Sequence, residues 1–167
     1  SPPRGEGATV EPASTKYVSM RIALIGFGAI GRYVFERLPE EVSVAGIVMR
    51  PERVDALAAE LQDGPPVVGA IKELEKVDLV VEVAGHAGLA AHGVAALEAG
   101  HDLLVVSVGA LADDDLRTRL IAAAGGGGAK LSILPGAVGG IDALSAAREG
   151  GLDRVVYYSI KPPAAWR

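Results

Sequence analysis

The chain has 167 residues, a formal net charge of −5 and a hydrophobic content of 50%, which suits one α/β domain with a well-filled core. The negative charge, without a basic stripe, argues against nucleic-acid binding, and apolar runs no longer than a strand argue against a membrane-spanning helix. The sequence contains no cysteine, which excludes disulfides, thiolate metal sites and a cysteine nucleophile and fits a cytoplasmic protein.

Residues 1–19 are rich in Pro, Gly, Ser, Thr and Glu and lack the apolar stretch of a signal peptide. We interpret them as a disordered tail or an artificial extension and assign them no function. Met20 stands directly before the first apolar strand and has the position of a natural start. A dinucleotide-binding domain is expected over residues 20–140, and residues 141–167 are expected to begin a truncated substrate and dimerisation domain.

A glycine-rich turn follows the first strand. Four apolar residues, 22–25, lead into Gly-x-Gly-x-x-Gly at Gly26, Gly28 and Gly31, and a helix-like pattern continues over residues 29–38. In a dinucleotide fold the first glycine permits the tight turn, the second lets backbone N–H groups approach a pyrophosphate, and the third lets the helix lie close to the strand. The pyrophosphate then rests on the positive N-terminal end of the helix. This context favours nucleotide binding over a chance glycine triplet.

The end of the second strand bears on the type of cofactor. Residues 42–48 form an apolar strand that ends at Met49 and Arg50, about 20 residues past the glycine motif. An NAD-selective site usually has Asp or Glu here for the ribose 2′-hydroxyl, whereas Arg50 suits a 2′-phosphate. The alternative for Arg50 is a solvated loop charge. We therefore expect NADP to be accepted at least as well as NAD.

The rest of the chain alternates between strands and helices, which predicts a parallel sheet with right-handed crossovers. Helices are expected over residues 52–61, 70–75, 87–99, 113–124 and 141–149, with the glycines at 125–128 as a flexible end to the fourth. Strands are expected over residues 67–68, 77–83, 102–106, 130–134 and 154–160. The predicted fold is α/β, a Rossmann-type doubly wound parallel sheet with only the beginning of a second α+β domain. Because no second sheet follows residues 154–160, we interpret the chain as a fragment of a longer protein.

Ligands of an open parallel sheet bind beyond the carboxyl ends of its strands. Three segments besides the glycine turn fall there: residues 84–86, 107–111 and 135–140. Their small side chains leave room for a nicotinamide and its ribose, and backbone amides in the last segment could face an anionic substrate. The predicted cofactor-binding residues are Gly26, Gly28, Ala29, Ile30, Gly31, Arg50, Ala84, Gly85, His86, Ser107, Val108 and Gly109.

No residue is assigned a catalytic role. His86, at a helix N-terminus, is the candidate for acid–base work, although the helix dipole disfavours the cation that this chemistry would use; the alternatives are a contact with cofactor or substrate and a structural role. His92 is expected to be a packing or surface residue and His101 to be solvated. Lys161 either binds a carboxylate or is a surface charge, and Ser107 lacks the base partner of a nucleophile. The three histidines have neither the spacing nor the acidic companions of a metal site.

Five segments of the sequence resemble the L-aspartate dehydrogenase family, in its order and spacing from Met20 to the end. They are residues 26–31, 82–86, 104–111, 134–148 and 161–166. The last two, Leu-Pro-Gly-Ala-Val-Gly-Gly-Ile-Asp-Ala-Leu-Ser-Ala-Ala-Arg and Lys-Pro-Pro-Ala-Ala-Trp, are far more specific than a glycine triplet.

The resemblance implies an NAD(P)-dependent enzyme that converts L-aspartate to iminoaspartate, with amination of oxaloacetate as the reverse reaction, and that feeds NAD biosynthesis. Hydride would pass from the substrate α-carbon to the nicotinamide, while the protein supplies orientation and charge. Members of the family are homodimers whose second α+β domain carries the substrate contacts and a catalytic histidine. The sequence ends before that domain, and His86 is not that histidine by position, so we expect this chain to be the cofactor-binding half.

Two alternatives stay open. A related reductase of the dihydrodipicolinate-reductase or homoserine-dehydrogenase type has the same domain plan, although the motif at residues 135–144 argues against it. A non-catalytic NAD(P)-binding or redox-sensing module would fit a chain this short. Residues 158–160 also differ from the Thr-Gly-Arg-like stretch of many family members, so local substrate contacts are not carried over.

Overall fold

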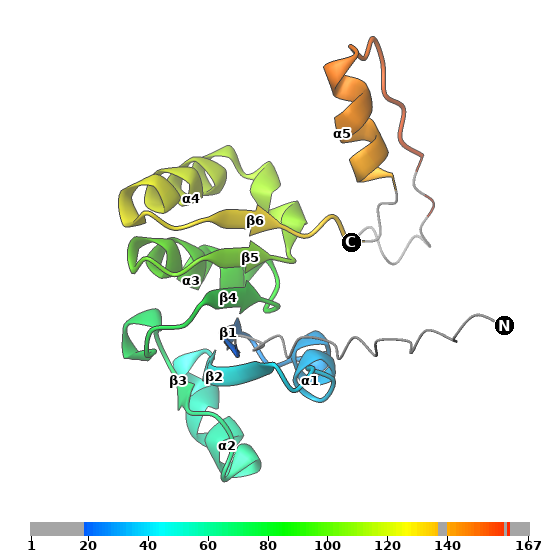
Figure 1. The fold of residues 1–167 in the computed structure, drawn as a ribbon. Helices are drawn as coiled ribbons and strands as arrows, with labels where there is room; N and C mark the ends of the chain where they lie inside the picture. The colour runs from blue at the N-terminus through cyan, green and yellow to red at the C-terminus, as the bar shows by residue number, and fades with distance from the viewer. Residues whose placement is uncertain (1–18, 137–139, 159, 161–167) are drawn as a thin grey trace, which may run out of the picture. The chain divides into compact units, whose positions relative to one another are not determined.

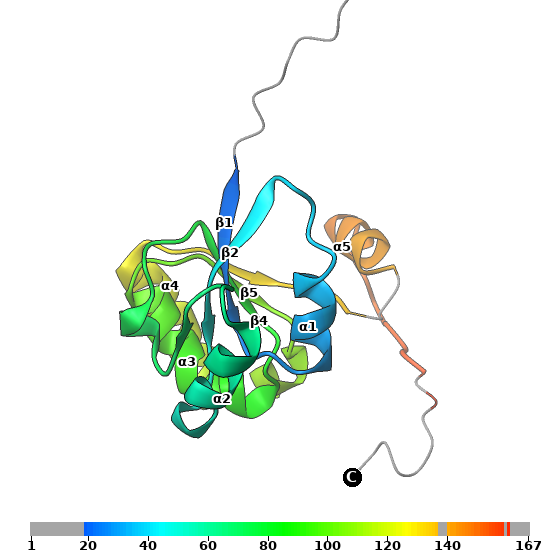
Figure 2. The same cartoon turned by 90° about the horizontal axis from the view of Figure 1, so that it is seen from below.

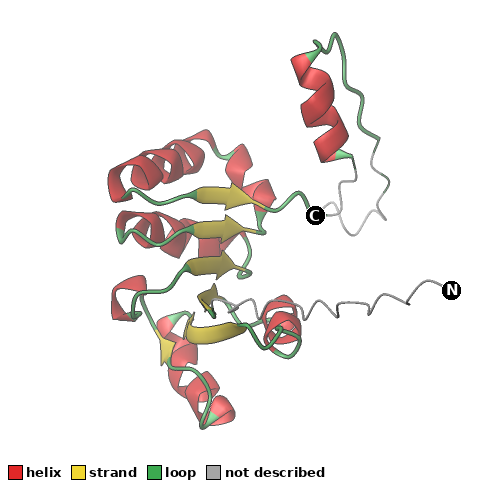
Figure 3. Cartoon of the chain, viewed as in Figure 1, coloured by secondary structure: helices red, strands yellow, loops and turns green. Residues whose placement is uncertain are grey.

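A computed structural model describes residues 19–136, 140–158 and 160 of the chain (Figure 1). The chain divides into two compact units, one ending at Leu134 and the other beginning at Pro135. In the first unit strands and helices alternate along the chain, as the sequence predicted (Figure 3).

The first unit is built on one sheet of six parallel strands in the order β3-β2-β1-β4-β5-β6 (Figure 1). The strands are β1 (Met20–Ile25), β2 (Val42–Val48), β3 (Val67–Val68), β4 (Leu79–Glu82), β5 (Leu103–Val105) and β6 (Leu131–Ile133). The chain runs outward from β1 to β3, crosses back to place β4 beside β1, and then runs outward in the other direction. The strand order therefore reverses between β1 and β4, which is the switch point at which such sheets bind ligands.

Helices cover both faces of this sheet, and Figure 2 shows α3 and α4 on one side of it and α1 on the other. The helices are α1 (Ala29–Phe35), α2 (Pro51–Leu61), α3 (His86–Glu98) and α4 (Asp114–Gly127), with short 3-10 helices η1 (Ile71–Glu73) and η2 (Val108–Ala112). Strand β1 supplies both layers, because successive side chains of a strand point to opposite faces. Ala23 and Ile25 join the core formed with α3 and α4, whereas Ile22 and Leu24 join the core beside α1 and α2. The doubly wound α/β prediction is confirmed.

The helix expected over residues 70–75 is only the short η1, and two longer helices end three residues away from their predicted ends. Helix α1 ends at Phe35 rather than Leu38, because Pro39 disfavours helical backbone in the residue before it. The glycines that were expected to form a flexible turn continue α4 as far as Gly127, and only Gly128 leaves the helix, with φ of +63°. A Cβ on Gly127 would overlap the carbonyl of Leu97 in α3, so glycine there lets the two helices approach closely.

The second unit contains α5 (Ile141–Glu149), which has no buried residue. The strand predicted over residues 154–160 is wrong: residues 154–158 and Ile160 have no regular structure, and residue 159 lies outside the described part. An apolar run becomes a strand only when a neighbouring strand satisfies its backbone groups, and none of the described residues pairs with this segment. Within the described ranges, no helix is both long and apolar enough to cross a membrane.

Candidate functional site

A pocket of about 470 Å³ opens at the carboxyl ends of β1, β2 and β4. It lies at the switch point of the sheet, where ligands of open α/β folds bind. The lining residues are Ile25, Gly26, Phe27, Gly28, Val48, Met49, Arg50, Arg53, Val83, Ala84, Ala87, Gly88, Ala91 and His92. Of the predicted cofactor-binding residues, the pocket brings together Gly26, Gly28, Arg50 and Ala84.

The glycine turn after β1 has the space that a dinucleotide loop needs. Gly26 has φ of +93°, and a Cβ on it would lie 2.6 Å from the Cβ of Ala84, so a larger residue would push the turn away from β4. A Cβ on Gly31 would lie 2.8 Å from the carbonyl oxygen of Gly26, so α1 can pack closely here only with glycine. In contrast, a Cβ on Gly28 would meet nothing within 4 Å, so the space above this residue is open to a ligand. The predicted residues Ala29 and Ile30 are exposed in the first turn of α1.

Three charged side chains lie just after β2, at the start of α2. Arg50 precedes α2 and Arg53 lies in its first turn, and both line the pocket. The sequence prediction included Arg50 but missed Arg53. Glu52, which it did not weigh either, lies with Oε1 3.6 Å from Nε of Arg50, and both side chains are exposed. Two cations that suit a phosphate therefore line this corner of the pocket, and one carboxylate that suits a ribose hydroxyl lies beside Arg50.

On the other side of β1, Glu82 connects two loops. Its side chain at the end of β4 is fully buried. Oε1 accepts hydrogen bonds from the backbone N of Ala84 at 2.8 Å, from that of Gly85 at 2.9 Å, and from Oγ of Ser107 at 2.9 Å. Oε2 accepts one from the backbone N of Ser107 at 2.9 Å. The predicted residues Ala84, Gly85 and Ser107 are thus held by a carboxylate to which the sequence reasoning gave no role.

The remaining predicted residues of this side lie beside those loops. His86 is exposed and begins α3, as predicted. A Cβ on Gly109 would lie 2.8 Å from Nε2 of His86, so the imidazole lies directly against η2, in which Val108 is exposed. His86, Val108 and Gly109 are not among the residues that line the pocket.

The other two histidines differ from expectation. His92 is half-buried and lines the pocket, and burial lowers its pKa from the ordinary value of 6.5. A register argument could have found it, because His92 lies one helical turn after Gly88, and both face the end of β1. His101 is buried rather than solvated, at 5% exposure, and its Nδ1 has no hydrogen-bond partner among the described residues. The α3–β5 turn that carries it lies at the amino end of β5, whereas the pocket lies at the carboxyl ends of the strands.

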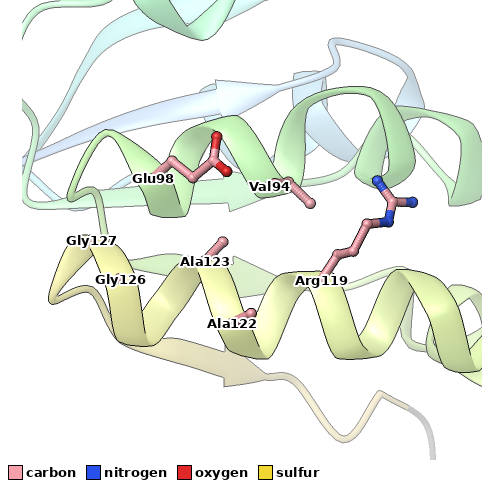
Figure 4. A pocket seen from close by; sticks show the side chains of 7 residues that line it. All are labelled: Val94, Glu98, Arg119, Ala122, Ala123, Gly126 and Gly127. Atoms are coloured by element: carbon pink, nitrogen blue, oxygen red, sulfur yellow. The ribbon is translucent and has the colours of Figure 1, made fainter.

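A second, more open pocket of about 450 Å³ lies between α3 and α4 (Figure 4). Glu98 lines it from α3, and Arg119 and the small residues Ala122 and Ala123 line it from α4. It contains none of the predicted cofactor-binding residues, and it lies on the helical layer rather than at the strand ends. In the described ranges, no group of three His, Asp or Glu side chains could hold a metal ion. Lys161 and residues 137–139 of the predicted substrate turn lie outside those ranges.

The sequence matches one family model, described as the NAD-binding domain of homoserine dehydrogenase, over residues 26–133. Among curated relatives, the L-aspartate dehydrogenase of Ruegeria pomeroyi is 47% identical over 149 residues, which are 89% of this chain and 54% of the relative. The L-aspartate dehydrogenase of Pseudomonas aeruginosa is 46% identical over an alignment of 152 residues, which covers 88% of this chain and 57% of the relative. The chain thus spans about half the length of the curated relatives that it matches.

Solved structures are similar in fold. Aspartate dehydrogenase from Thermotoga maritima matches with a TM-score of 0.60 and 22% identity, over 78% of this chain and 52% of the other. The WlbA dehydrogenase from Bordetella pertussis, solved in complex with NADH and UDP-GlcNAcA, matches with a TM-score of 0.57 and 15% identity, over 70% of this chain and 35% of the other. At these identities the matches support the arrangement of the sheet and helices.

Proposed function

This chain belongs to the family described as the NAD-binding domain of homoserine dehydrogenase. From this membership together with its similarity to L-aspartate dehydrogenases, we propose that it is the cofactor-binding half of an NAD(P)-dependent L-aspartate dehydrogenase. The proposed reaction of the complete protein is oxidative deamination of L-aspartate to iminoaspartate, with amination of oxaloacetate as its reverse. The names of relatives at 46–47% identity support this substrate over others.

One observation carries the cofactor part of the proposal: the pocket at the switch point joins the open space above Gly28 to the two guanidinium groups of Arg50 and Arg53. A dinucleotide needs an uncrowded backbone for its pyrophosphate and a recognition group for its adenosine ribose, in this relative placement. Both are present at adjacent strand ends. We propose that the cofactor lies across these ends, with the adenosine ribose at β2 and the nicotinamide half over β4 and β5.

The chain's own residues would bind and orient. Gly26 and Gly28 keep side chains away from the pyrophosphate, and Arg50 and Arg53 attract a 2′-phosphate. Ala84, Gly85, His86, Ser107, Val108 and Gly109 border the nicotinamide half in this placement. When bound, the nicotinamide supplies the hydride chemistry. No described residue is proposed as a catalytic acid or base.

The resemblance to the family also supports three further proposals for the complete protein. It acts as a homodimer, it works in the cytoplasm, and its product enters NAD biosynthesis. Sedimentation of the complete protein tests the first, and a monomer that turns over aspartate would overturn it.

The experiment that tests the proposed function is an absorbance assay of the complete protein with NADP and L-aspartate, beside the same assay with L-homoserine. We expect reduction of the nicotinamide with aspartate and little with homoserine. Turnover of homoserine alone would favour the runner-up, a homoserine-dehydrogenase-type enzyme, which the description of the matching family supports. Tight NADP binding without turnover of either substrate would favour a non-catalytic binding module.

A further inference from the structure

Glu82 is a carboxylate in a fully buried position, where it would ordinarily destabilise the fold. A buried carboxylate without hydrogen-bond partners lowers the free energy of unfolding far more than an apolar side chain in the same strand. Hydrophobic packing therefore does not explain why a glutamate occupies this position. Its hydrogen-bond partners are three backbone amides and one hydroxyl rather than a cation. The charge is therefore stabilised only while the two loops that supply these donors keep their shape.

Those two loops come from distant parts of the sequence. The β4–α3 loop supplies the backbone amides of Ala84 and Gly85. Ser107, which lies two residues after the end of β5 and 25 positions from Glu82, donates from both its backbone N and its hydroxyl group. Gly85 has φ of +87° and precedes α3 without a side-chain cap, so Glu82 satisfies an amide at the start of this helix. The helices that follow these loops meet where His86 of α3 lies against Gly109 of η2.

The two loops lie where the nicotinamide half of a dinucleotide would bind. The adenosine ribose of a dinucleotide is recognised at the end of β2 and its pyrophosphate at the glycine turn after β1. Since β4 and β5 follow β1 on the other side of the switch point, the nicotinamide half must extend over their ends. The loops held by Glu82 are the surface on which it would rest.

We propose that Glu82 is a positioning residue that holds the β4–α3 loop and the Ser107 loop in the shape that receives the nicotinamide half of the cofactor. This inference rests on the proposed function. The role requires a carboxylate, because a glutamine amide has one acceptor oxygen where Glu82 has two. With its oxygen in the place of Oε1, the glutamine NH₂ group faces the backbone N–H of Ser107, and two donors oppose each other.

The test compares two ligands by calorimetry on the chain and its variants. NADPH has both halves, whereas adenosine 2′,5′-bisphosphate has the adenosine half only. We expect Glu82→Gln to weaken NADPH binding about tenfold and bisphosphate binding less than about twofold. The matched control is Glu40→Gln, which makes the same change in the exposed turn before β2, at the opposite end of the strands, and it should alter neither affinity.

A double-variant cycle separates positioning from a direct contact of Ser107 with the cofactor. Glu82→Ala removes both acceptor oxygens, so if both residues act through one tether, adding Ser107→Ala to Glu82→Ala should lose no further NADPH affinity. Additive losses would overturn the tether. Should the Glu82 variants fail to fold, Ser107→Ala carries the test: it should weaken NADPH about threefold, leave the bisphosphate unaffected, and speed hydrogen exchange of the Ala84 and Gly85 amides in the ligand-free chain, which loss of a direct contact with the cofactor would not do.

The outcomes distinguish the two proposals. If the unsubstituted chain binds neither ligand, the proposed function fails and the inference with it. If it binds both, and Glu82→Gln loses both equally or neither, only the inference fails, because a general loss of stability would not discriminate between the ligands.

Discussion

Arg50 and Glu52 place opposite charges beside the pocket, with 3.6 Å between Nε and Oε1. A 2′-phosphate is attracted by the guanidinium and repelled by the carboxylate, whereas a 2′-hydroxyl can donate a hydrogen bond to the carboxylate. We therefore expect Arg50→Ala to weaken NADP binding about tenfold with little effect on NAD, and Glu52→Gln to shift preference further toward NADP. Dissociation constants for the two cofactors, measured side by side, test both variants.

Arg37→Ala is the matched control for Arg50→Ala. Arg37 is an exposed arginine in the turn after α1, where it pairs with Glu36, and it does not line the pocket. It should leave both affinities unchanged. A loss of NAD and NADP binding to the same extent in Arg50→Ala would contradict recognition of a 2′-phosphate by this residue.

His92 gives the nucleotide-binding unit a pH dependence. Burial in the pocket lowers its pKa below 6.5, so the folded chain binds a proton less readily than the unfolded chain. The free energy of unfolding therefore contains a penalty that is fully present below the folded pKa and disappears as the pH rises through the unfolded pKa. We expect stability to rise between about pH 5 and about pH 7.5, and His92→Gln to reduce this rise. Urea unfolding of both proteins at the two pH values measures it, and an identical rise in the variant would contradict the assignment.

At the scale of elements, the contact between α3 and α4 depends on one of three consecutive helical glycines. A Cβ on Gly127 would overlap the carbonyl of Leu97, whereas a Cβ on Gly125 or Gly126 would meet nothing within 4 Å. Alanine favours helix over glycine, so Gly125→Ala and Gly126→Ala should each stabilise the chain by about 0.5–1 kcal/mol. Gly127→Ala should instead destabilise it by about 1–3 kcal/mol, because the helices must separate. Urea unfolding compares the three, and stabilisation by all three would show that α3 and α4 do not pack this closely.

Strands and the glycine turn could be predicted from the sequence because their signals are local. The apolar run at residues 22–25 and the glycines after it specify a buried strand and a turn without reference to other parts of the chain. Residues 154–160 show the limit of such a signal. The apolar pattern is equally clear there, but a strand also needs a partner, and the sequence does not reveal one.

The burial of Glu82 and His101 could not be predicted from the sequence, because residues far along the chain contribute to their surroundings. A carboxylate at a strand end normally indicates solvent, but Glu82 is buried and bonded to Ser107, which follows the next strand, as well as to its own loop. His101 follows a glycine in a turn, which normally indicates exposure, yet it is buried at 5% exposure. The sequence did contain one signal for Glu82. An acidic residue at a strand end is followed closely by the small residues Ala84 and Gly85, whose backbone amides are free to turn toward a carboxylate.

At the scale of the whole molecule, the sheet and both hydrophobic core clusters lie entirely before Pro135. The last strand, β6, is followed at once by Leu134, whose backbone N donates to the carbonyl of Val105 at 3.0 Å. All predicted cofactor-binding residues fall between Gly26 and Gly109.

A chain that ends after Leu134 should therefore unfold cooperatively and bind NADP within about twofold of the 167-residue chain. In both proteins, NADP at about 100 times its dissociation constant should add about 2.7 kcal/mol to the free energy of unfolding. Urea unfolding with and without NADP, together with calorimetry, tests this. A tenfold loss of affinity in the shorter chain would mean that residues 135–167 contribute to the cofactor site, since the core of the first unit contains none of them.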